Sequence, residues 1–499
     1  MPTSVFMTRP QSKAPFLNVT VQNDFSPGYV FIGPYQHPGA GAYIYDKFGN
    51  LVWDGFGVVG SANAHDFKVC QYQGAPHLCV SQMNQQDGYG VGQGMIIDSN
   101  YTVVTTVNTG RNMMPADMHE LNLVDGGTHA LMTSYNTIPY DMTPFGIDQG
   151  IGWLSEGAFQ EVDVDTGDVL FEWYSSNHVD PTESLLKPKG SDISGDGLTP
   201  ATGFDYFHIN AIDKSPTTGN YMVSARHTSS IYYINATDQS IIWALSTWNP
   251  RSDFATGGFN FTWQHDARFI SENDTNTIIS IFDNASNGAN QSAKQSSAMI
   301  INIDHGAKRA SLMQQVRANF IPQGIMSASQ GNTQILSNGN FFIGWGSRAW
   351  LSEHSPDGDT VFAAHYADPL IAGGAMNYRA FSFEWESTPA NTVPAVYSYA
   401  LDQDSANRIY VSWNGATTVG IWRFYAASNV GDSFVPIGTT AKDGFETVWV
   451  ADTYYSWVMV EAVALDGSSL RNSSFQPTFV PSRQLSASCN QDQCPLINS

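Results

Sequence analysis

The chain has 499 residues, with 22 lysines and arginines against 45 aspartates and glutamates, and its formal net charge is −23. A field of this sign repels nucleic acid and anionic membrane surfaces, so we expect neither as a partner. No apolar run is long enough to span a bilayer, and residues 1–4 lack the charged and apolar regions of a signal peptide.

Two features predict a protein of the secretory pathway or the extracellular space, whose signal peptide is absent from this sequence. Eight Asn-X-Ser/Thr sequons occur, at Asn18, Asn100, Asn235, Asn260, Asn273, Asn284, Asn290 and Asn472. The four cysteines form two close pairs, Cys70 with Cys79 and Cys489 with Cys494, which suits local disulfides. Four reduced thiols are the alternative. We reject zinc at the second pair because no histidine lies near it.

Residues 1–28 are expected to form an N-terminal extension, and short predicted strands begin at Tyr29. Runs that alternate apolar and polar residues recur along the chain and are separated by Asp-Gly, Gly-Asn and Thr-Gly turns. A hairpin of the outer type, over residues 43–53, precedes the first full repeat. Long helical periodicity is nearly absent, so the pattern indicates an all-β protein.

The repeat unit is clearest where four strands follow one another, at residues 207–212, 221–224, 230–234 and 241–243. The first two strands of this unit recur elsewhere with a polar marker at one position: His65, His119, His208, His265 and Gln330. A sixth copy, without the marker, joins residues 396–398 to residues 409–412. The outer hairpins match at residues 159–173, 230–243, 299–313 and 350–362.

Six such repeats predict a six-bladed β-propeller of four-stranded antiparallel blades over residues 29–475, followed by a C-terminal tail, 476–499. Strands near the N-terminus would complete the last blade and close the ring, because closure removes exposed sheet edges. A β-sandwich, or a pair of them, is the alternative fold. It would not explain why one marker returns at one strand position.

The marker residues predict an active centre on the propeller axis. The innermost strand of each blade lines the central channel, so we expect His65, His119, His208 and His265, with Gln330, to face one axial space. The alternative is that each histidine satisfies backbone groups inside a tight channel. Imidazoles exchange protons near neutral pH. A zinc or copper site would need three of them at bonding distance, and we predict neither a metal nor a cofactor.

Arg226 follows the second strand of the third repeat and is a candidate clamp for an anion or a developing oxyanion. Its alternative role is a surface ion pair. Trp345, Trp350 and Trp413 follow second strands of later repeats and are candidates for an apolar wall against a flat substrate. Buried core packing is the alternative for these three side chains.

At residues 207–210 (FHIN), 219–221 (GNY), 224–229 (SARHTS) and 263–268 (WQHDAR), the sequence resembles the arylsulfotransferase family, and its fungal branch most closely. The resemblance extends from about Tyr29 to Leu465. It implies a propeller that moves a sulfuryl group between phenols without a nucleotide donor, through a sulfohistidine. Motif by motif, His265 resembles the nucleophile. His208 and Arg226 resemble the sulfate-binding pair, and His119 resembles the remaining axial histidine.

Fungal relatives include hetero-Diels–Alderases of tropolonic sesquiterpene biosynthesis, and we expect this activity because the fungal branch matches better and an acidic chain does not attract a sulfated donor. The partners would be a tropolonic substrate, dehydrated to a quinone methide, and a humulene-type terpene. An imidazolium would protonate the leaving hydroxyl while Arg226 holds the tropolonate oxygens. Sulfuryl transfer between phenols is the alternative, and a non-catalytic propeller that binds a glycan or a protein is the third hypothesis.

Overall fold

The computed structural model describes residues 3–36, 38–60, 64–85, 88–147, 150–188, 194–248, 250–368 and 374–494. In these ranges the chain is all-β, and almost every strand pairing is antiparallel. The helices are single 3₁₀ turns: η1 (Asp125–Gly127), η2 (Thr143–Phe145), η3 (Ser175–Asn177), η4 (Pro181–Glu183), η5 (Pro200–Thr202) and η6 (Ser486–Ser488). None of these described helices has the length and apolar character needed to cross a membrane.

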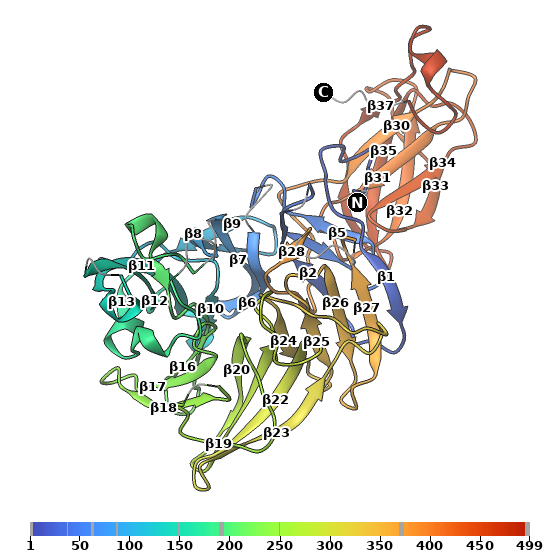
Figure 1. The fold of residues 1–499 in the computed structure, drawn as a ribbon. Helices are drawn as coiled ribbons and strands as arrows, with labels where there is room; N and C mark the ends of the chain where they lie inside the picture. The colour runs from blue at the N-terminus through green and yellow to red at the C-terminus, as the bar shows by residue number, and fades with distance from the viewer. Residues whose placement is uncertain are drawn as a thin grey trace.

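Four sheets follow one another along the chain, and in each the strands pair in chain order (Figure 1). The first contains β6 (Ala64–Tyr72), β7 (Ala75–Gln85), β8 (Gly90–Ile97) and β9 (Val103–Val107). The second contains β10 (Leu121–Val124), β11 (His129–Asp141), β12 (Ile151–Asp163) and β13 (Val169–Tyr174), with β14 (Phe204–Asp205) beside β12. The third contains β15 (Ile209–Lys214), β16 (Tyr221–Ala225), β17 (Ser230–Ile234) and β18 (Ile241–Ser246). The fourth contains β20 (His265–Glu272), β21 (Asn276–Asp283), β22 (Ser297–Asp304) and β23 (Arg309–Val316), with β19 (Ala255–Thr256) beside β23.

The fifth and sixth sheets combine strands from both ends of the chain. The fifth contains β24 (Asn332–Ile335), β25 (Phe341–Gly344), β26 (Trp350–His354) and β27 (Thr360–His365), with β1 (Asn18–Gln22) on its outer edge. The sixth contains β29 (Phe381–Phe383), β2 (Tyr29–Ile32), β4 (Tyr43–Tyr45) and β5 (Leu51–Asp54). A short pair, β3 (Pro34–Tyr35) with β28 (Met376–Asn377), adds a second contact between the same segments.

The six sheets lie around a common centre, which gives a β-propeller-like arrangement (Figure 1). Their first strands meet there, since β6 contacts β10, β15 contacts β20, and β29 contacts β6. Clusters of buried apolar residues fill the spaces between neighbouring sheets. Phe342 and Val30 belong to the cluster between the fifth and sixth sheets, and the Phe31 and Phe67 rings, 5.5 Å apart, belong to that between the sixth and first.

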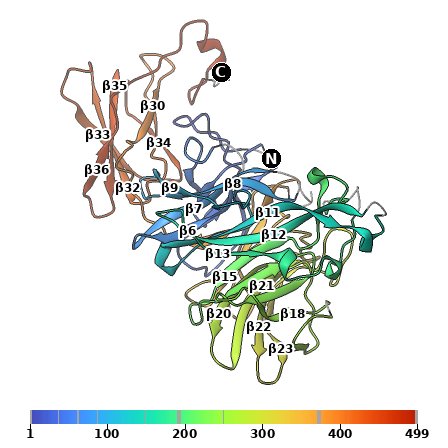
Figure 2. The same cartoon turned by 90° about the vertical axis from the view of Figure 1, so that its left-hand side faces the viewer.

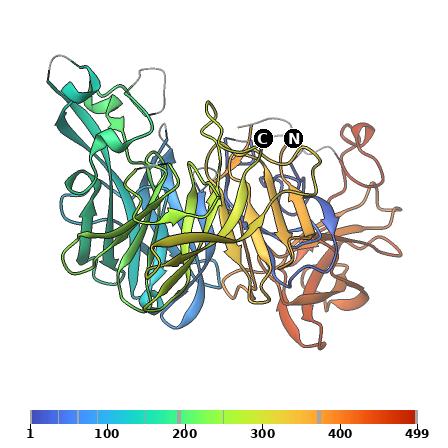
Figure 3. The ribbon, with the colours of Figure 1, turned by 60° about the horizontal axis from the view of Figure 1, so that its bottom comes forward.

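The predicted sixth copy of the repeat is wrong. Residues 396–398 and 409–412 do pair, in β30 (Ala395–Tyr399) and β31 (Arg408–Ser412), but they continue to β34 (Glu446–Val450) in a separate sheet. A second C-terminal sheet packs against it and contains β32 (Val419–Ala427), β33 (Val435–Ala441), β35 (Trp457–Ala464), β36 (Ser469–Asn472) and β37 (Gln476–Pro477). Figures 2 and 3 show these sheets projecting from one side of the molecule. The alternating pattern of a strand pair is the same in either setting, so it did not identify the sheet.

The tail and the predicted N-terminal extension both join neighbouring sheets. The extension supplies β1, and the Tyr399 hydroxyl donates to the carbonyl oxygen of Asn490 in the tail, at 2.7 Å. Residues 495–499 lie outside the described ranges. Both predicted disulfides are present, between Cys70 and Cys79 and between Cys489 and Cys494. The first joins β6 to β7 within one sheet.

Replacing Cys70 and Cys79 together with alanine should lower the free energy of unfolding by about 2–3 kcal/mol, because the bridge restricts the unfolded chain. Urea titration followed by tryptophan fluorescence measures this change. The same double replacement at Cys489 and Cys494 is the control, since that bridge closes a tail outside the six sheets. An unchanged denaturation midpoint in the first variant would contradict the prediction.

Candidate functional site

His119 lies two residues before β10 and is oriented by a carboxylate two residues earlier in the chain. Its Nδ1 lies 2.5 Å from Oδ1 of Asp117, and both side chains are buried. Burial opposes ionisation of Asp117, yet the adjacent His119 and the backbone amide of Gly90 hold the pKa of this carboxyl below its usual value. A carboxylate only accepts, so Nδ1 carries the proton. Nε2 has no hydrogen-bond partner among the described residues.

His208, before β15, is oriented in the same way by Asp205 at the end of β14. The His119 and His208 rings are 5.0 Å apart and lie edge to face. This second pair differs electrically from the first. Burial raises the pKa of Asp205, and burial together with the charges of His119 and Arg226 lowers the pKa of His208 well below its usual value. The imidazole of His208 is therefore uncharged at neutral pH.

Arg226 follows β16 and is 3% exposed, so its guanidinium belongs to this buried site and not to the surface. It donates to Nε2 of His227 at 2.7 Å and to the carbonyl oxygen of Ala328 at 3.1 Å. Its guanidinium carbon lies 5.6 Å from the centre of the Trp263 ring. His227 is itself held by a 2.6 Å contact between its Nδ1 and the carbonyl oxygen of Asp205. A fixed cation of this kind can bind a planar or tetrahedral anion.

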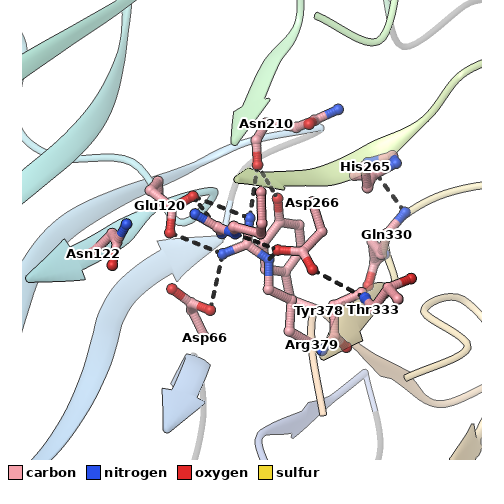
Figure 4. Close-up of polar contacts among 12 residues, drawn as sticks. Asp66, Glu120, Asn122, Asn210, His265, Asp266, Gln330, Thr333, Tyr378 and Arg379 are labelled. Carbon is pink, nitrogen blue, oxygen red and sulfur yellow. Dashed lines mark hydrogen bonds and ion pairs between the residues drawn. The ribbon is translucent and has the colours of Figure 1, made fainter. Parts of the chain in front are cut away.

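His265 begins β20, and its tautomer is set by Asn284 (Figure 4 shows His265 beside Gln330). The amide nitrogen of Asn284 donates to two backbone carbonyls, of Ser327 and Gln330, which turns its Oδ1 toward His265. Nδ1 of His265 therefore donates to this oxygen, at 2.7 Å, and Nε2 carries the lone pair. In the resting site the backbone amide of Gln330 donates to Nε2 at 3.2 Å. Burial, and then the charge of Arg226, lowers the pKa of His265 well below its usual value.

The residues predicted to face one axial space fall into two groups. The Tyr378 ring lies 5.3 Å from that of His119 and 6.4 Å from that of His265, which joins these two histidines. His65 packs instead against Tyr35, at 4.6 Å between ring centres. The side chain of Gln330 contacts Met376, whose sulfur also accepts from the Tyr35 hydroxyl. His65 and Gln330 therefore form a second group beside the three clustered histidines.

The three tryptophans predicted to line the site pack in hydrophobic cores. Trp345 is fully buried, donates to Ser352 and packs with Trp350 in the cluster between the fourth and fifth sheets. Trp413 lies in the core of the C-terminal sheets. These three positions correct the prediction that the tryptophans form a wall against the substrate. Large aromatic side chains gain most from complete burial, which favours packing in a core.

Asn284 is also buried, so its sequon, unlike an exposed one, offers no acceptor for a glycan.

Several functional candidates were missed in the sequence: Asp117, Asp205, His227, Asn284 and Tyr378. A usable signal existed for the first two, since an aspartate precedes the marker histidine by two or three residues in both the second and third repeats. His227 directly follows Arg226. Nothing local marks Asn284 or Tyr378, whose roles depend on contacts with residues far away in the chain.

Among the residues that the structure describes, two groups of side chains have the donor types of a metal site. Asp205, His208 and His227 bring one ligand atom each within 4.8 Å of one another, as do Asp125, His129 and Glu161. In the second group Nζ of Lys214 already lies 2.6 Å from Asp125 and 2.9 Å from Glu161. In the first, Nδ1 of each histidine already contacts Asp205.

None of the clustered histidines lines either of two large surface cavities. One, of about 800 Å³, is lined by the far halves of the first strands, including Lys68, Arg268, Phe269 and Phe381. The other, of about 900 Å³, lies where Lys442 of the C-terminal sheets approaches the sixth sheet. The histidine site is therefore a buried polar cluster rather than a part of either cavity.

The lowered histidine pKa values predict how stability depends on pH. An unfolded imidazole titrates near pH 6.5, whereas folded His208 and His265 stay neutral well below it. Below about pH 6.5 the unfolded chain therefore binds protons that the folded chain does not. Because of these two histidines, the free energy of unfolding decreases as the pH falls. In His208→Gln the slope of unfolding free energy against pH, between about pH 5 and 6, should fall by up to about 1.4 kcal/mol per pH unit. Urea titrations at several pH values measure it, and equal slopes in both proteins would contradict the assignment.

One family model matches the part of the chain that contains the buried arginine and the oriented histidines. The model described as Arylsulfotransferase (ASST) matches residues 71–367. The chain belongs to the arylsulfotransferase family. This supports a sulfotransferase-like enzyme, whereas the hetero-Diels–Alder reaction and membership of the fungal branch stay predictions without support from the comparisons. No curated protein matches the chain.

Several solved structures resemble this member of the arylsulfotransferase family distantly. A Bacteroides caccae protein of unknown function is 14% identical, with a TM-score of 0.38 over 71% of this chain and 98% of that one. The β-propeller domain of Swd1 from Myceliophteria thermophila is 10% identical, with a TM-score of 0.23 over 61% of this chain and 99% of that one. Hsv2 from Kluyveromyces lactis is 11% identical, with a TM-score of 0.25 over 60% of this chain and 86% of that one.

Proposed function

We propose that the protein transfers a sulfuryl group from an aryl sulfate to a phenol at the site formed by His119, His208, Arg226 and His265. The observation that carries this proposal is the buried guanidinium of Arg226 beside histidines that burial keeps uncharged. A sulfate ester is an anion, which Arg226 can bind, and an uncharged imidazole has the lone pair that a nucleophile needs. Family membership agrees with this chemistry.

In the first half-reaction, Nε2 of His265 attacks sulfur and a nitrogen–sulfur bond forms as the bond from sulfur to the aryl oxygen breaks. Arg226 holds the sulfuryl oxygens, and the uncharged His208, whose proton faces Asp205, lines the site beside them. The backbone amide of Gln330 must leave Nε2 for this attack, because it donates to the same lone pair. The departing phenolate oxygen takes a proton from Nε2 of His119, so a neutral phenol leaves.

In the second half-reaction the acceptor phenol returns that proton to His119 while its oxygen attacks sulfur. The nitrogen–sulfur bond breaks, and His265 recovers its lone pair. The ionised carboxylate of Asp117, 2.5 Å from Nδ1 of His119, is placed to stabilise the imidazolium form that His119 has before the first half-reaction and regains after the second. The Tyr378 ring, packed against both histidines, is a surface for the flat phenol.

We further propose that the six sheets are the blades of one closed propeller over residues 18–383, with residues 395–477 as a second, all-β unit. The pairing of β2 with β29 supports closure, as do the buried clusters on both sides of the sixth sheet. This replaces the predicted division into residues 1–28, 29–475 and 476–499. The two disulfides support an oxidising compartment, in the secretory pathway or outside the cell.

A direct assay tests the proposed reaction. The purified protein is incubated with 4-nitrophenyl sulfate and phenol, and nitrophenol release is followed together with formation of phenyl sulfate. A second sample, without acceptor, is digested and analysed by mass spectrometry for a sulfated histidine. Absence of both products would overturn the proposal. Parallel incubation with a hydroxymethyl tropolone and humulene tests the cycloaddition, for which no sulfated intermediate is needed.

A further inference from the structure

A fully buried arginine, Arg379, lies between Tyr378 and β29 and reaches four of the other sheets (Figure 4). Its Nη1 lies 3.0 Å from Asp66 and 3.0 Å from Glu120, and its Nε lies 3.3 Å from Asp266. Its Nη2 donates to the carbonyl oxygen of Asn210 at 2.9 Å. One side chain from the sixth sheet therefore contacts the first, second, third and fourth.

Two further cations complete an electrically balanced cluster. Lys68 lies 2.7 Å from Asp66, and Arg268 lies 2.7 Å from Glu120 and 2.9 Å from Asp266. We name these three cations and three carboxylates the axial ion cluster: Asp66, Lys68, Glu120, Asp266, Arg268 and Arg379. Burial alone would raise the pKa of Glu120, but Arg268, Arg379 and Lys68 lower it to about 2. Removing one member would leave a buried charge uncompensated.

The cluster is connected to the histidine site through the backbone. Each of its carboxylates directly follows a marker histidine, in the pairs His65–Asp66, His119–Glu120 and His265–Asp266. In each pair the histidine and the carboxylate are joined by one peptide bond. A shift of Asp266 toward or away from Arg379 therefore moves His265 as well.

The backbone at these positions is held in an unfavourable conformation. Asp66 has φ 52°, Asp266 has φ 56° and His208 has φ 54°, all in the left-handed region that residues with a Cβ avoid. Strand pairing is irregular just after His65 and His265. Residues keep such a conformation only where surrounding contacts hold them in it. The ion pairs of Asp66 and Asp266 supply those contacts.

We propose that Arg379 is a positioning residue that sets the spacing of the axial histidines by holding the residue after His65, His119 and His265 and the carbonyl of Asn210. Tyr378 couples it to the site directly, since the guanidinium lies 4.9 Å from the Tyr378 ring and that ring packs on His119. Arg379 contributes no atom to the reaction. The role in turnover rests on the proposed sulfuryl transfer, whereas the role in histidine geometry does not.

Arg379→Lys keeps the charge and loses the guanidinium fork, so it is the informative variant. Its kcat for aryl sulfate should fall by about 10²-fold, the cost of small misplacement of reacting groups, with little change in KM. Lys47→Met is the control, because Lys47 is an equally buried cation, 2.6 Å from Glu353, and contacts none of the four axial histidines. It should lower stability and leave kcat unchanged.

A measurement without turnover separates this proposal from the proposed function. With ¹⁵N-labelled histidine, long-range nitrogen–proton NMR spectra report the tautomer and environment of each imidazole. The signals of His119 and His265 should shift in Arg379→Lys and stay in place in Lys47→Met. If Arg379→Lys does not fold, Glu120→Gln, which keeps shape and removes one charge, should shift the His119 signal. Unshifted histidine signals in the folded variant would overturn the proposal, even in a protein without sulfotransferase activity.

Discussion

Arg226→Lys should lower kcat/KM for an aryl sulfate by about 10²–10³-fold, the loss expected when a preorganised donor to a developing oxyanion is removed. Lysine keeps the positive charge, but it lacks the planar fork that now donates to both His227 and the Ala328 carbonyl. Its ammonium group therefore cannot keep those two contacts and also face the sulfuryl oxygens. Steady-state release of nitrophenol from 4-nitrophenyl sulfate measures the effect.

The control for this variant is Arg111→Lys. Arg111 pairs with Glu172 at 3.2 Å and its side chain is 57% exposed. It therefore has the same guanidinium group as Arg226 but is not buried. Its replacement should leave kcat/KM unchanged, because exposed ion pairs contribute little. If Arg226→Lys retained the wild-type value, the guanidinium would not be the sulfate clamp and the assignment of this site would be wrong.

His265→Ala should abolish the transfer, since no lone pair remains at the position of attack, and no sulfated peptide should appear in the digest. His119→Ala should slow turnover by about 10²–10⁴-fold, as the loss of a general acid and base does, and should still yield a sulfated His265. Mass spectrometry of the trapped protein separates the two roles. His354→Ala is the matched control, because His354 is also fully buried but lies in the fifth sheet.

The histidine that carries the trapped sulfate shows whether His265 or His119 is the nucleophile. Nε2 of His265 accepts from the Gln330 amide in the resting site, whereas Nε2 of His119 has no partner among the described residues. Sulfate found on His119 would assign the nucleophile there and make His265 the accessory group. A protein that forms a cycloadduct and never a sulfated histidine would refute sulfuryl transfer altogether.

Many of the strand pairs were predictable because they depend on local sequence patterns. Alternating strands with turn residues specify antiparallel hairpins, so the strand pairs at residues 207–224 and 265–280 were found correctly. The Cys70–Cys79 bridge also lies within one hairpin. Pairings between distant segments have no such signal. The register that joins Phe31 to Phe381 is an example, and its absence led to the wrong choice of residues 396–412 for the sixth sheet.

The sequence by itself determined the all-β class, the repeating strand unit, both disulfides and the residue types that meet near the axis, because each depends on neighbours within a few tens of residues. Only the tertiary structure decided which of those residues meet. It grouped His119, His208 and His265 with Arg226 and put His65 beside Tyr35. It assigned Trp345 and Trp413 to cores, and it placed Arg379 among carboxylates from three other sheets. The physical reason is that burial and charge pairing depend on how sheets pack, and no local pattern encodes that packing.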